Sequence, residues 1–237
     1  MTKDTLDGRL LSCADLVGAG GVLADIGTDH AYLPIFLLKS GKIKRAILSD
    51  VNEGPLMSAR ENVRDAGLAD RCELVLSDGA RGISDLSVTD YAVCGMGGEL
   101  IARIVSEAPA MKRSGVRLIL QPMSRQAHLR RALYSEGYAI LEERYSKADG
   151  KYYVTFLAEY GGEVDMPCGE ELELGREAPH PCDKNEYVGF LLNRRCALIS
   201  VIEGKSAAGK SADFERELVE AIDRRLMPYQ NNEGSTL

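Results

Sequence analysis

Short apolar runs alternate with amphipathic stretches through the first half of the chain. Runs that end in glycine or aspartate are typical of buried parallel strands, whereas apolar residues at every third or fourth position are typical of helices packed on a sheet. The predicted strands are Val22–Ile26, Arg45–Ser49, Cys72–Leu76, Tyr91–Cys94 and Val116–Leu120. The predicted helices are residues 5–18, 33–40, 54–67, 98–108 and 125–137.

The alternation then gives way to two neighbouring strand-like segments. Residues Tyr138–Tyr145 and Lys151–Tyr160 are rich in β-branched and aromatic side chains and flank Asp149-Gly150, a strong hairpin-turn signal. We therefore predict an α/β, Rossmann-like fold with a mostly parallel, seven-stranded sheet that ends in an antiparallel hairpin.

A second unit follows a segment rich in Gly, Pro and Glu. Two apolar stripes at helical spacing predict an antiparallel helical hairpin over residues 184–228. The stripes are Tyr187, Leu191, Leu198 and Ile202, then Phe214, Leu218, Ile222 and Leu226. The predicted organisation is a domain over residues 1–163, a linker over 164–183, the hairpin over 184–228 and a mobile tail from Pro228.

Residues Gly204–Ser211 match the P-loop expression G-x-x-x-x-G-K-S. A P-loop requires a buried strand before its glycine turn and a helix after it, so that backbone amides cradle a phosphate. Here the preceding segment has a helical pattern. We interpret the match as a flexible turn between two helices and do not predict a nucleotide triphosphatase.

Composition adds limits on location and partners. The 237 residues are 45% hydrophobic and 27% charged, as in an ordinary globular protein. No apolar run reaches the roughly 20 residues of a membrane span, and Asp4, Asp7 and Arg9 interrupt the N-terminus where a signal peptide is apolar. We expect a cytoplasmic protein, a monomer or weak oligomer. The net charge of −7 argues against a surface coated for nonspecific nucleic-acid binding.

The six cysteines show no disulfide-like spacing. Cys168, His180, Cys182 and Cys196 are zinc-type ligands, but their gaps match no familiar zinc module. We predict no metal site.

The candidate chemistry lies in the turns that follow four predicted strands, at the sheet edge where open α/β folds bind ligands. Gly27 allows a ligand close to the backbone, Asp50 suits two ribose hydroxyls, and Asp78-Gly79 suits an adenine amino group. The fourth turn begins at Gly95 and holds three glycines in four residues. The alternative for the turn at Gly27 is a tight strand-to-helix turn with a capping aspartate, and the alternative for Asp50 is a helix cap or a solvated loop acid. Their occurrence on successive strands predicts a nucleoside site.

Asp29 separates two nucleoside classes. A dinucleotide enzyme favours G-x-G-x-x-G, whose later glycines admit a pyrophosphate, but here Asp29 stands at the second glycine position. An anion at that place repels pyrophosphate and is compatible with a cationic sulfonium. The sequence therefore favours S-adenosylmethionine over NAD.

Five motifs together resemble the bacterial TrmK family of class I, S-adenosylmethionine-dependent tRNA methyltransferases, which act on N1 of adenine 22. These motifs are Asp25–Pro34 (DIGTDHAYLP), Asn52–Pro55, Ser77–Gly79, Gly95–Gly98 and Leu120–Pro122. The resemblance covers residues 5 to 160 and implies a terminal antiparallel hairpin and a C-terminal helical appendage. The family commonly has asparagine where this chain has Met123, which leaves the role of that position open.

The resemblance implies a reaction in which adenine N1 attacks the sulfonium methyl group. Because neutral N1 carries a free lone pair, the enzyme must supply alignment and charge stabilisation rather than a general base. The predicted catalytic residues are Asp29, to accept a hydrogen bond from the exocyclic amine, and Gln121, to contact the base edge; a helix cap is the alternative for Asp29. His30 and Tyr32 are second choices for contacting base or cofactor. The predicted cofactor-binding residues are Asp25, Gly27, His30, Asp50, Asp78, Gly79 and Gly95.

Adenine N1 lies on the pairing edge, so the base must leave its stack and the surrounding RNA must be gripped. Candidate phosphate contacts are Lys112, Arg113, Arg117, Arg125, Arg130, Arg131, Arg194 and Arg195, with solvated helix charges as the alternative for Arg130 and Arg131. Two other functions are compatible with these motifs: methylation of another RNA or a small molecule, and a non-catalytic binding role on the same fold.

Overall fold

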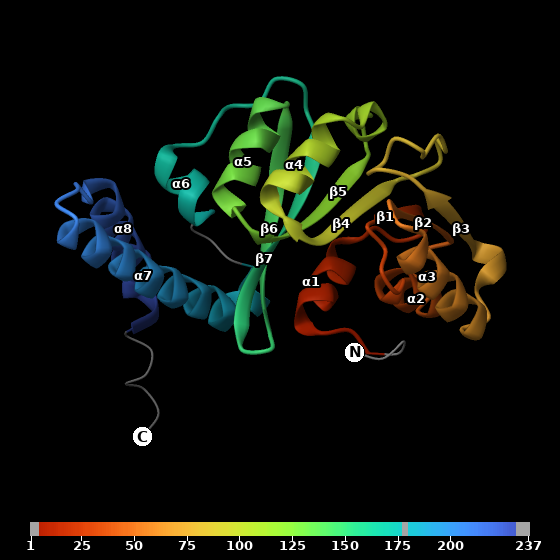
Figure 1. Cartoon of the computed structure of the whole chain (residues 1–237), viewed down its shortest axis with the longest axis horizontal. Helices are drawn as coiled ribbons and strands as arrows, with labels where there is room; N and C mark the ends of the chain where they lie inside the picture. Colours follow the sequence, from red (N-terminus) through yellow and green to blue (C-terminus); the bar gives the residue numbers. More distant parts are fainter. Residues whose placement is uncertain (1–4, 177–179, 231–237) are drawn as a thin grey trace.

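A computed structural model describes residues 5–176 and 180–230. Its centre is a seven-stranded sheet with the strand order β3-β2-β1-β4-β5-β7-β6 (Figure 1). The strands are β1 (Val22–Ile26), β2 (Arg45–Asp50), β3 (Cys72–Leu76), β4 (Asp90–Gly97), β5 (Arg117–Ser124), β6 (Tyr138–Ala148) and β7 (Lys151–Tyr160). Strands β3, β2, β1, β4 and β5 pair in parallel, whereas β7 runs antiparallel to both β5 and β6. The predicted fold class is confirmed.

Strand residues alternate between two buried layers because successive side chains point to opposite faces of a sheet. In β1, Leu23 joins one apolar cluster and Ala24 joins the other. The first face is covered by α1 (Gly8–Leu16), α2 (Tyr32–Lys39) and α3 (Glu53–Asp65), and the second by α4 (Gly98–Ser106) and α5 (Gln126–Ser135). Short 3-10 turns are η1 (Ala69–Arg71) and η2 (Pro109–Lys112). Because β2 and β4 lie on opposite sides of β1, their crossovers diverge there, which opens a crevice at the carboxyl edge.

Two short pieces of the segment predicted as a linker, residues 164–183, are helical and pack against the domain. They are α6 (Gly169–Leu174) and η3 (Pro181–Asp183). Leu172 and Leu174 are buried, and the Asp183 carboxylate accepts hydrogen bonds from the Arg144 guanidinium at 2.7 and 3.0 Å. The segment's richness in Gly, Pro and Glu suggested a linker, but Leu174 joins the core cluster, whereas Met166 is exposed.

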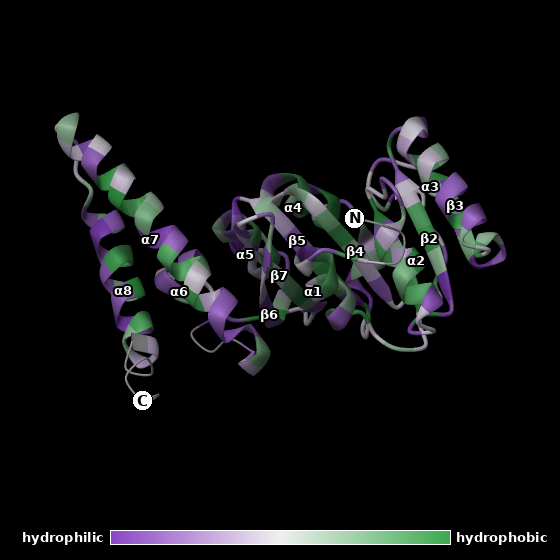
Figure 2. Cartoon of the chain, turned by 90° about the horizontal axis from the view of Figure 1, so that it is seen from below, coloured by the Kyte–Doolittle hydropathy of each residue, from purple (hydrophilic) through white to green (hydrophobic). Residues whose placement is uncertain are grey.

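The predicted helical hairpin is confirmed as α7 (Lys184–Ala207) and α8 (Asp213–Gln230), which project beyond the sheet with their joining turn at the far end (Figure 2). Its two stripes are mostly buried and belong to the same apolar cluster as the sheet, although Phe214 is exposed. Helix α8 continues through Pro228 to Gln230, and the rest of the predicted mobile tail lies outside the described residues.

The hairpin is fixed to the sheet at its base. The Tyr187 ring packs edge-on against Tyr145 of β6, with centroids 4.9 Å apart, and a side chain at Gly189 would collide with the Tyr152 ring of β7. At the opposite end, the P-loop-like sequence forms the last turn of α7 and the following turn, where Lys205 binds Glu215. Within residues 5–176 and 180–230, no helix has the length and apolar character to cross a bilayer.

Candidate active site

A cavity of about 300 Å³ lies at the divergence of β1 and β4. Helix α1, the turn between β1 and α2, and the end of β4 form its walls. The lining residues are Arg9, Leu10, Asp25, Gly27, Thr28, Asp29, His30, Ala31, Tyr32, Leu33, Cys94, Gly95 and Met96. The structure therefore brings together six residues that the sequence predicted for the site, which are Asp25, Gly27, Asp29, His30, Tyr32 and Gly95.

Gly27 forms the floor of this cavity. Its φ of 76° lies in the left-handed region, and its amide donates a 2.7 Å hydrogen bond to the Ser49 carbonyl of β2. A Cβ atom here would overlap the terminal methyl of Met96 from β4. The left-handed backbone favours glycine here, whereas the Met96 methyl, at the end of a flexible side chain, could move aside; the missing side chain lets a ligand approach the main chain.

Asp25 places a carboxylate at the inner wall of the cavity. The residue is only 8% exposed. Burial, which disfavours the ionised form, raises the pKa of Asp25 to about 6; the Thr28 hydroxyl opposes the rise and the negative Asp50 adds to it. A ligand cation beside Asp25 would stabilise the carboxylate.

Arg9 of α1 supplies a positive charge to the same cavity, and sequence reasoning missed it. Its Nη1 donates to Gln121 Oε1 at 3.0 Å, and its Nη2 lies 3.6 Å from Asp7. The only sequence signal was an arginine in a helix with an apolar face, which does not reveal where that arginine points.

Gln121 lies behind the cavity rather than in its lining. Its side chain is fully buried, and Oε1 accepts a second hydrogen bond from the Gly95 amide at 3.1 Å. Its Nε2 donates to the Pro122 carbonyl and approaches the Met123 sulfur at 3.8 Å. Gln121 thus fixes the last part of β4, at Gly95, and the Arg9 side chain. Met123 itself is exposed.

Asp29, His30 and Tyr32 form the mouth of the cavity. Asp29 Oδ2 lies 3.3 Å from His30 Nε2, and the rings of His30 and Tyr32 stack with centroids 5.1 Å apart and planes inclined by 26°. Helix α2 begins after Ala31, whose backbone is left-handed. No side chain caps this end of the helix. Asp29 is 72% exposed at its side chain and does not cap the helix, so the capping alternative does not describe this structure.

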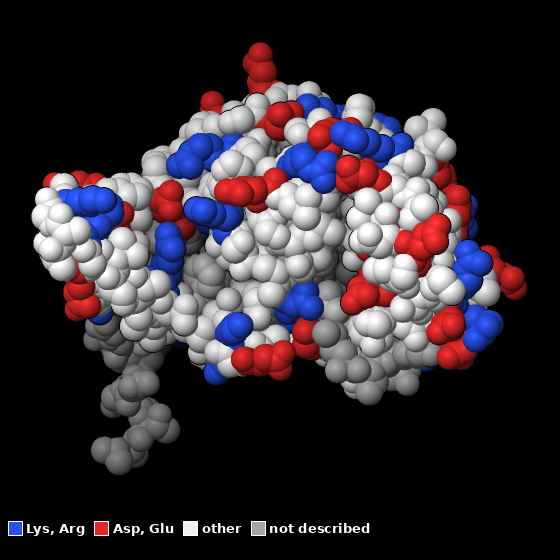
Figure 3. All heavy atoms as spheres, viewed as in Figure 1, with Lys and Arg blue, Asp and Glu red and all other residues white. Residues whose placement is uncertain are grey.

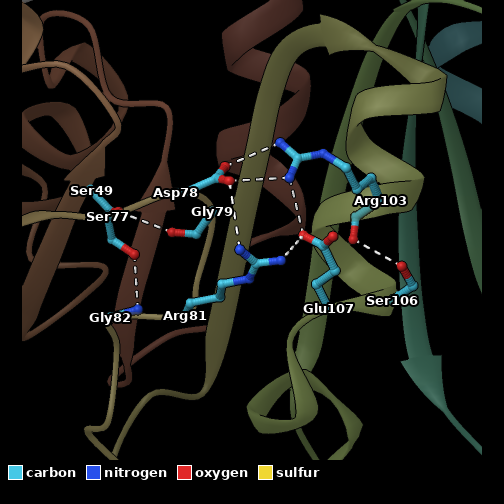
Figure 4. Close-up of polar contacts among 9 residues, drawn as sticks. All are labelled: Ser49, Ser77, Asp78, Gly79, Arg81, Gly82, Arg103, Ser106 and Glu107. Carbon is cyan, nitrogen blue, oxygen red and sulfur yellow. Dashed lines mark hydrogen bonds and ion pairs between the residues drawn. The ribbon is translucent and has the colours of Figure 1, made fainter.

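Asp50 and Asp78 lie outside the cavity, on the neighbouring ends of β2 and β3. Asp50 Oδ1 accepts from the Asn52 amide at 2.8 Å, and its carbonyl accepts from the Ser77 amide at 2.9 Å. The Asp78 carboxylate is held by both terminal nitrogens of Arg103, and Ser49 Oγ donates to the Gly79 carbonyl at 3.1 Å (Figure 4). These two acids therefore lie next to one another in the strand order, at the same carboxyl edge of the sheet as the cavity.

Several predicted phosphate contacts have other partners. Arg130 is 1% exposed and binds Glu143 at 2.8 and 2.9 Å, so neither a phosphate contact nor a solvated helix charge describes it. The others are engaged as follows: Lys112 with Glu136, Arg113 with the Leu86 and Val88 carbonyls, Arg117 with Asp90, and Arg195 with Asp223. The positions looked exposed in sequence because their partners are distant along the chain.

Three predicted cations line a second cavity where α5, α6 and α7 approach the end of β5. Arg125 is 71% exposed at its side chain and lies 3.5 Å from Glu99; Arg131 and Arg194 share Glu173 at 3.8 and 3.5 Å. His128 and Phe190 also line this cavity. Acidic and basic side chains intermingle on the face shown in Figure 3, so this is a local cluster of cations rather than a uniform basic surface.

The zinc-type residues Cys168, Cys182 and Cys196 are exposed. In the described part of the chain, no three His, Cys, Asp or Glu side chains are arranged to hold a metal ion.

Comparison with known proteins places these features in context. Residues 6–156 match a protein family described as a methyltransferase domain. A Bacillus subtilis protein named tRNA (adenine(22)-N(1))-methyltransferase is 37% identical over 227 residues, which cover 94% of this chain and 95% of that protein.

Two solved structures are similar over nearly the whole chain. A Streptococcus pneumoniae protein in complex with S-adenosyl-L-methionine superposes with a TM-score of 0.77 at 32% identity, covering 92% of this chain and 98% of that one. The M. capricolum TrmK structure in complex with S-adenosyl-homocysteine has a TM-score of 0.74 at 26% identity, with 94% and 97% covered.

Proposed function

Because this chain belongs to the family of tRNA (adenine(22)-N(1))-methyltransferases, we infer that it transfers the methyl group of S-adenosylmethionine to N1 of adenine 22 in tRNA. The observation that carries this inference is the cavity at the divergence of β1 and β4, which combines a glycine floor with charges of both signs.

The residues of the cavity fit the amino-acid end of S-adenosylmethionine. That end is a zwitterion, and the cavity offers the Asp25 carboxylate for its ammonium and the Arg9 guanidinium for its carboxylate. Gly27 allows the ligand to approach the backbone where a side chain would collide with Met96. When bound, the cofactor supplies an electrophilic methyl group on a positively charged sulfur.

The adenosine end fits the edge formed by β2 and β3. Asp50 retains one carboxylate oxygen without a hydrogen bond from Asn52, and an anionic acceptor at this strand end suits the two hydroxyls of a ribose. Asp78 and Gly79 suit the adenine amino group and ring edge. Asp50 ends β2, which pairs with β1, and Asp78 follows β3, which pairs with β2 on its other side, so one elongated nucleoside can reach from Asp78 past Asp50 to Gly27.

We propose that Asp29 orients the target base by accepting a hydrogen bond from its exocyclic amine. This carboxylate also favours the positive charge that moves onto the adenine during methyl transfer. The stacked rings of His30 and Tyr32 offer an aromatic surface for the extruded base. Gln121 contributes by position, since it holds Gly95 in β4 and the Arg9 side chain while its own polar atoms are occupied.

The RNA contacts are proposed at the cavity that Arg125, Arg131 and Arg194 line. These cations come from both the methyltransferase domain, residues 1–163, and the hairpin, residues 184–228, so a bound phosphate backbone would bridge the two. Arg125 follows β5 directly, near the glycine turn at the start of α4: a Cβ on Gly98 would overlap the Arg125 carbonyl. The proposal includes action in the cytoplasm on tRNA, as a monomer or weak oligomer.

Mass spectrometry of tRNA nucleosides tests the function. The protein is incubated with S-adenosylmethionine and either an unmodified tRNA carrying adenine at position 22 or the same tRNA with guanine there. We expect 1-methyladenosine only in the first. Methylation of both tRNAs would indicate that the enzyme acts on another position or another RNA. Failure of the protein to bind S-adenosylmethionine would indicate a non-catalytic role.

A further inference from the structure

Four charged side chains form a closed network beside the turn that follows β3. Arg103 of α4 donates to both oxygens of Asp78 at 3.1 and 3.2 Å. Glu107, one turn further along α4, lies 3.1 Å from Arg103 and 2.9 Å from Arg81, and Arg81 lies 3.8 Å from Asp78 (Figure 4). The charges of the four residues cancel.

The network is more specific than an ordinary surface ion pair. Arg103 is fixed by two carboxylates, so its planar guanidinium has one orientation toward Asp78. The turn is also tied from its other side, since Ser49 of β2 donates to the Gly79 carbonyl and Ser77 Oγ accepts from the Gly82 amide at 2.8 Å. The Asp78 carboxylate is therefore held in place relative to both β2 and α4.

Asp78 keeps hydrogen-bonding capacity after Arg103 is satisfied. An ionised carboxylate has about four acceptor positions, and Arg103 occupies one on each oxygen. The adjacent guanidinium also holds the pKa of Asp78 below its usual value, so the side chain is an acceptor and not a donor. A primary amine in the plane of this carboxylate could therefore bind, whereas a ring position without a donor could not.

We propose that Arg103 is a positioning residue that makes the cofactor site selective for adenine. By holding the Asp78 carboxylate in one orientation, it allows Asp78 to receive the 6-amino group and penalises a purine that lacks this group. The inference rests on the proposed function, because it assigns Asp78 to the cofactor's adenine. Glu107 and Arg81 complete the arrangement by keeping Arg103 in place and balancing its charge.

The test compares two ligands that differ only in the 6-amino group: S-adenosylhomocysteine and its analogue with unsubstituted purine in place of adenine. Calorimetry gives the ratio of their dissociation constants. For the wild-type protein we expect a ratio of about ten or more, the effect of one charge-assisted hydrogen bond. For Arg103→Ala we expect a ratio below about three, because a freely rotating Asp78 no longer enforces the contact.

Arg103→Lys should give an intermediate ratio, since it keeps the charge but loses the bidentate geometry. Arg103→Gln carries the test if the alanine variant does not fold. The matched control is Arg45→Ala, which removes a 2.9 Å ion pair with Asp85 in the same β3–β4 connection but does not contact Asp78. This variant should keep the wild-type ratio.

A double-mutant cycle separates positioning from general loosening of the turn. In an Asp78→Ala background, adding Arg103→Ala should change the affinity for S-adenosylhomocysteine less than about twofold, because the acceptor is already gone. A wild-type ratio retained by Arg103→Ala, or tighter binding of S-adenosylhomocysteine by that variant, would overturn the inference and show that Arg103 is irrelevant to adenine or competes with it. A wild-type protein that binds neither ligand would overturn the proposed function itself.

Discussion

The substitution Asp25→Asn is expected to raise the free energy of unfolding and to weaken cofactor binding. Both effects depend on pH. The pKa of Asp25 rises from 3.8 to about 6 on burial. At about 1.36 kcal/mol per pKa unit, ionised Asp25 costs the folded state about 3 kcal/mol above pH 6. This is an upper figure, since the new amide also needs hydrogen-bond partners.

The sign of the effect sets the pH window. The folded state holds the Asp25 proton more tightly than the unfolded state, so the wild-type protein loses stability relative to the variant as pH rises from about 3.8 to about 6. Below that window both forms of the residue are neutral and the difference disappears. Above it the difference stays constant at about 1–3 kcal/mol in favour of Asp25→Asn.

Urea unfolding at a series of pH values measures this difference directly, because titration of all other groups cancels between the two proteins. Asp70→Asn, which removes an exposed carboxylate in η1, is the control and should show no such trend. In parallel, calorimetry with S-adenosylhomocysteine at pH 7.5 should show binding weakened about tenfold or more, since the ligand ammonium loses its anion. A stability difference that does not change between pH 4 and pH 7 would refute the reasoning.

Four further substitutions test other parts of the structure. Asp50→Ala should weaken the binding of S-adenosylhomocysteine at least several-fold, because the ribose hydroxyls lose an acceptor worth about 1.5–3 kcal/mol. An unchanged affinity in calorimetry would show that Asp50 does not bind the ligand. Asp29→Ala should fold normally yet methylate about tenfold more slowly or worse, and single-turnover rates within about a factor of two of wild type would contradict its role. Arg194→Ala should weaken tRNA binding and reduce the slope of log affinity against log salt concentration by about one. An unchanged slope would show that Arg194 does not contact a phosphate. Arg130→Ala should lower the free energy of unfolding by about 3–5 kcal/mol, since Glu143 stays buried without a counter-charge; a loss below about 1 kcal/mol would mean that water reaches Glu143.

The parallel sheet and its ligand-binding edge followed from local patterns. Gly27 follows β1, and Asp50 ends β2. These two strands are neighbours in the sheet, and the strand orders open to α/β folds are few, so the sequence could place the two residues at the same edge. The Asp149-Gly150 turn was equally local: both residues adopt positive φ, 47° and 75°, as its hairpin type requires.

Features that depend on distant partners did not follow from the sequence. Arg130 has the spacing of a solvated helix residue, and only the approach of Glu143 on β6 reveals it as a buried ion pair. The role of Arg9 likewise depends on where α1 packs, and the placement of Leu172 depends on the packing of α6 against α5, where Arg130 donates to the Leu172 carbonyl. Periodicity reports which face a residue occupies, but not what lies opposite that face.

The place of β7 in the sheet affects how the chain is made. This strand lies between β5 and β6, yet it is the last of the three to leave the ribosome. Until residues 151–160 emerge, β5 is an edge strand on that side and β6 has no strand to pair with. The unpaired backbone N–H and C=O groups of both strands can then pair with strands of other chains. Helix α7 follows this hairpin in the chain and packs against its Tyr145 and Tyr152 rings. Synthesis of this enzyme therefore passes through an aggregation-sensitive stage that ends only when its last strand is inserted.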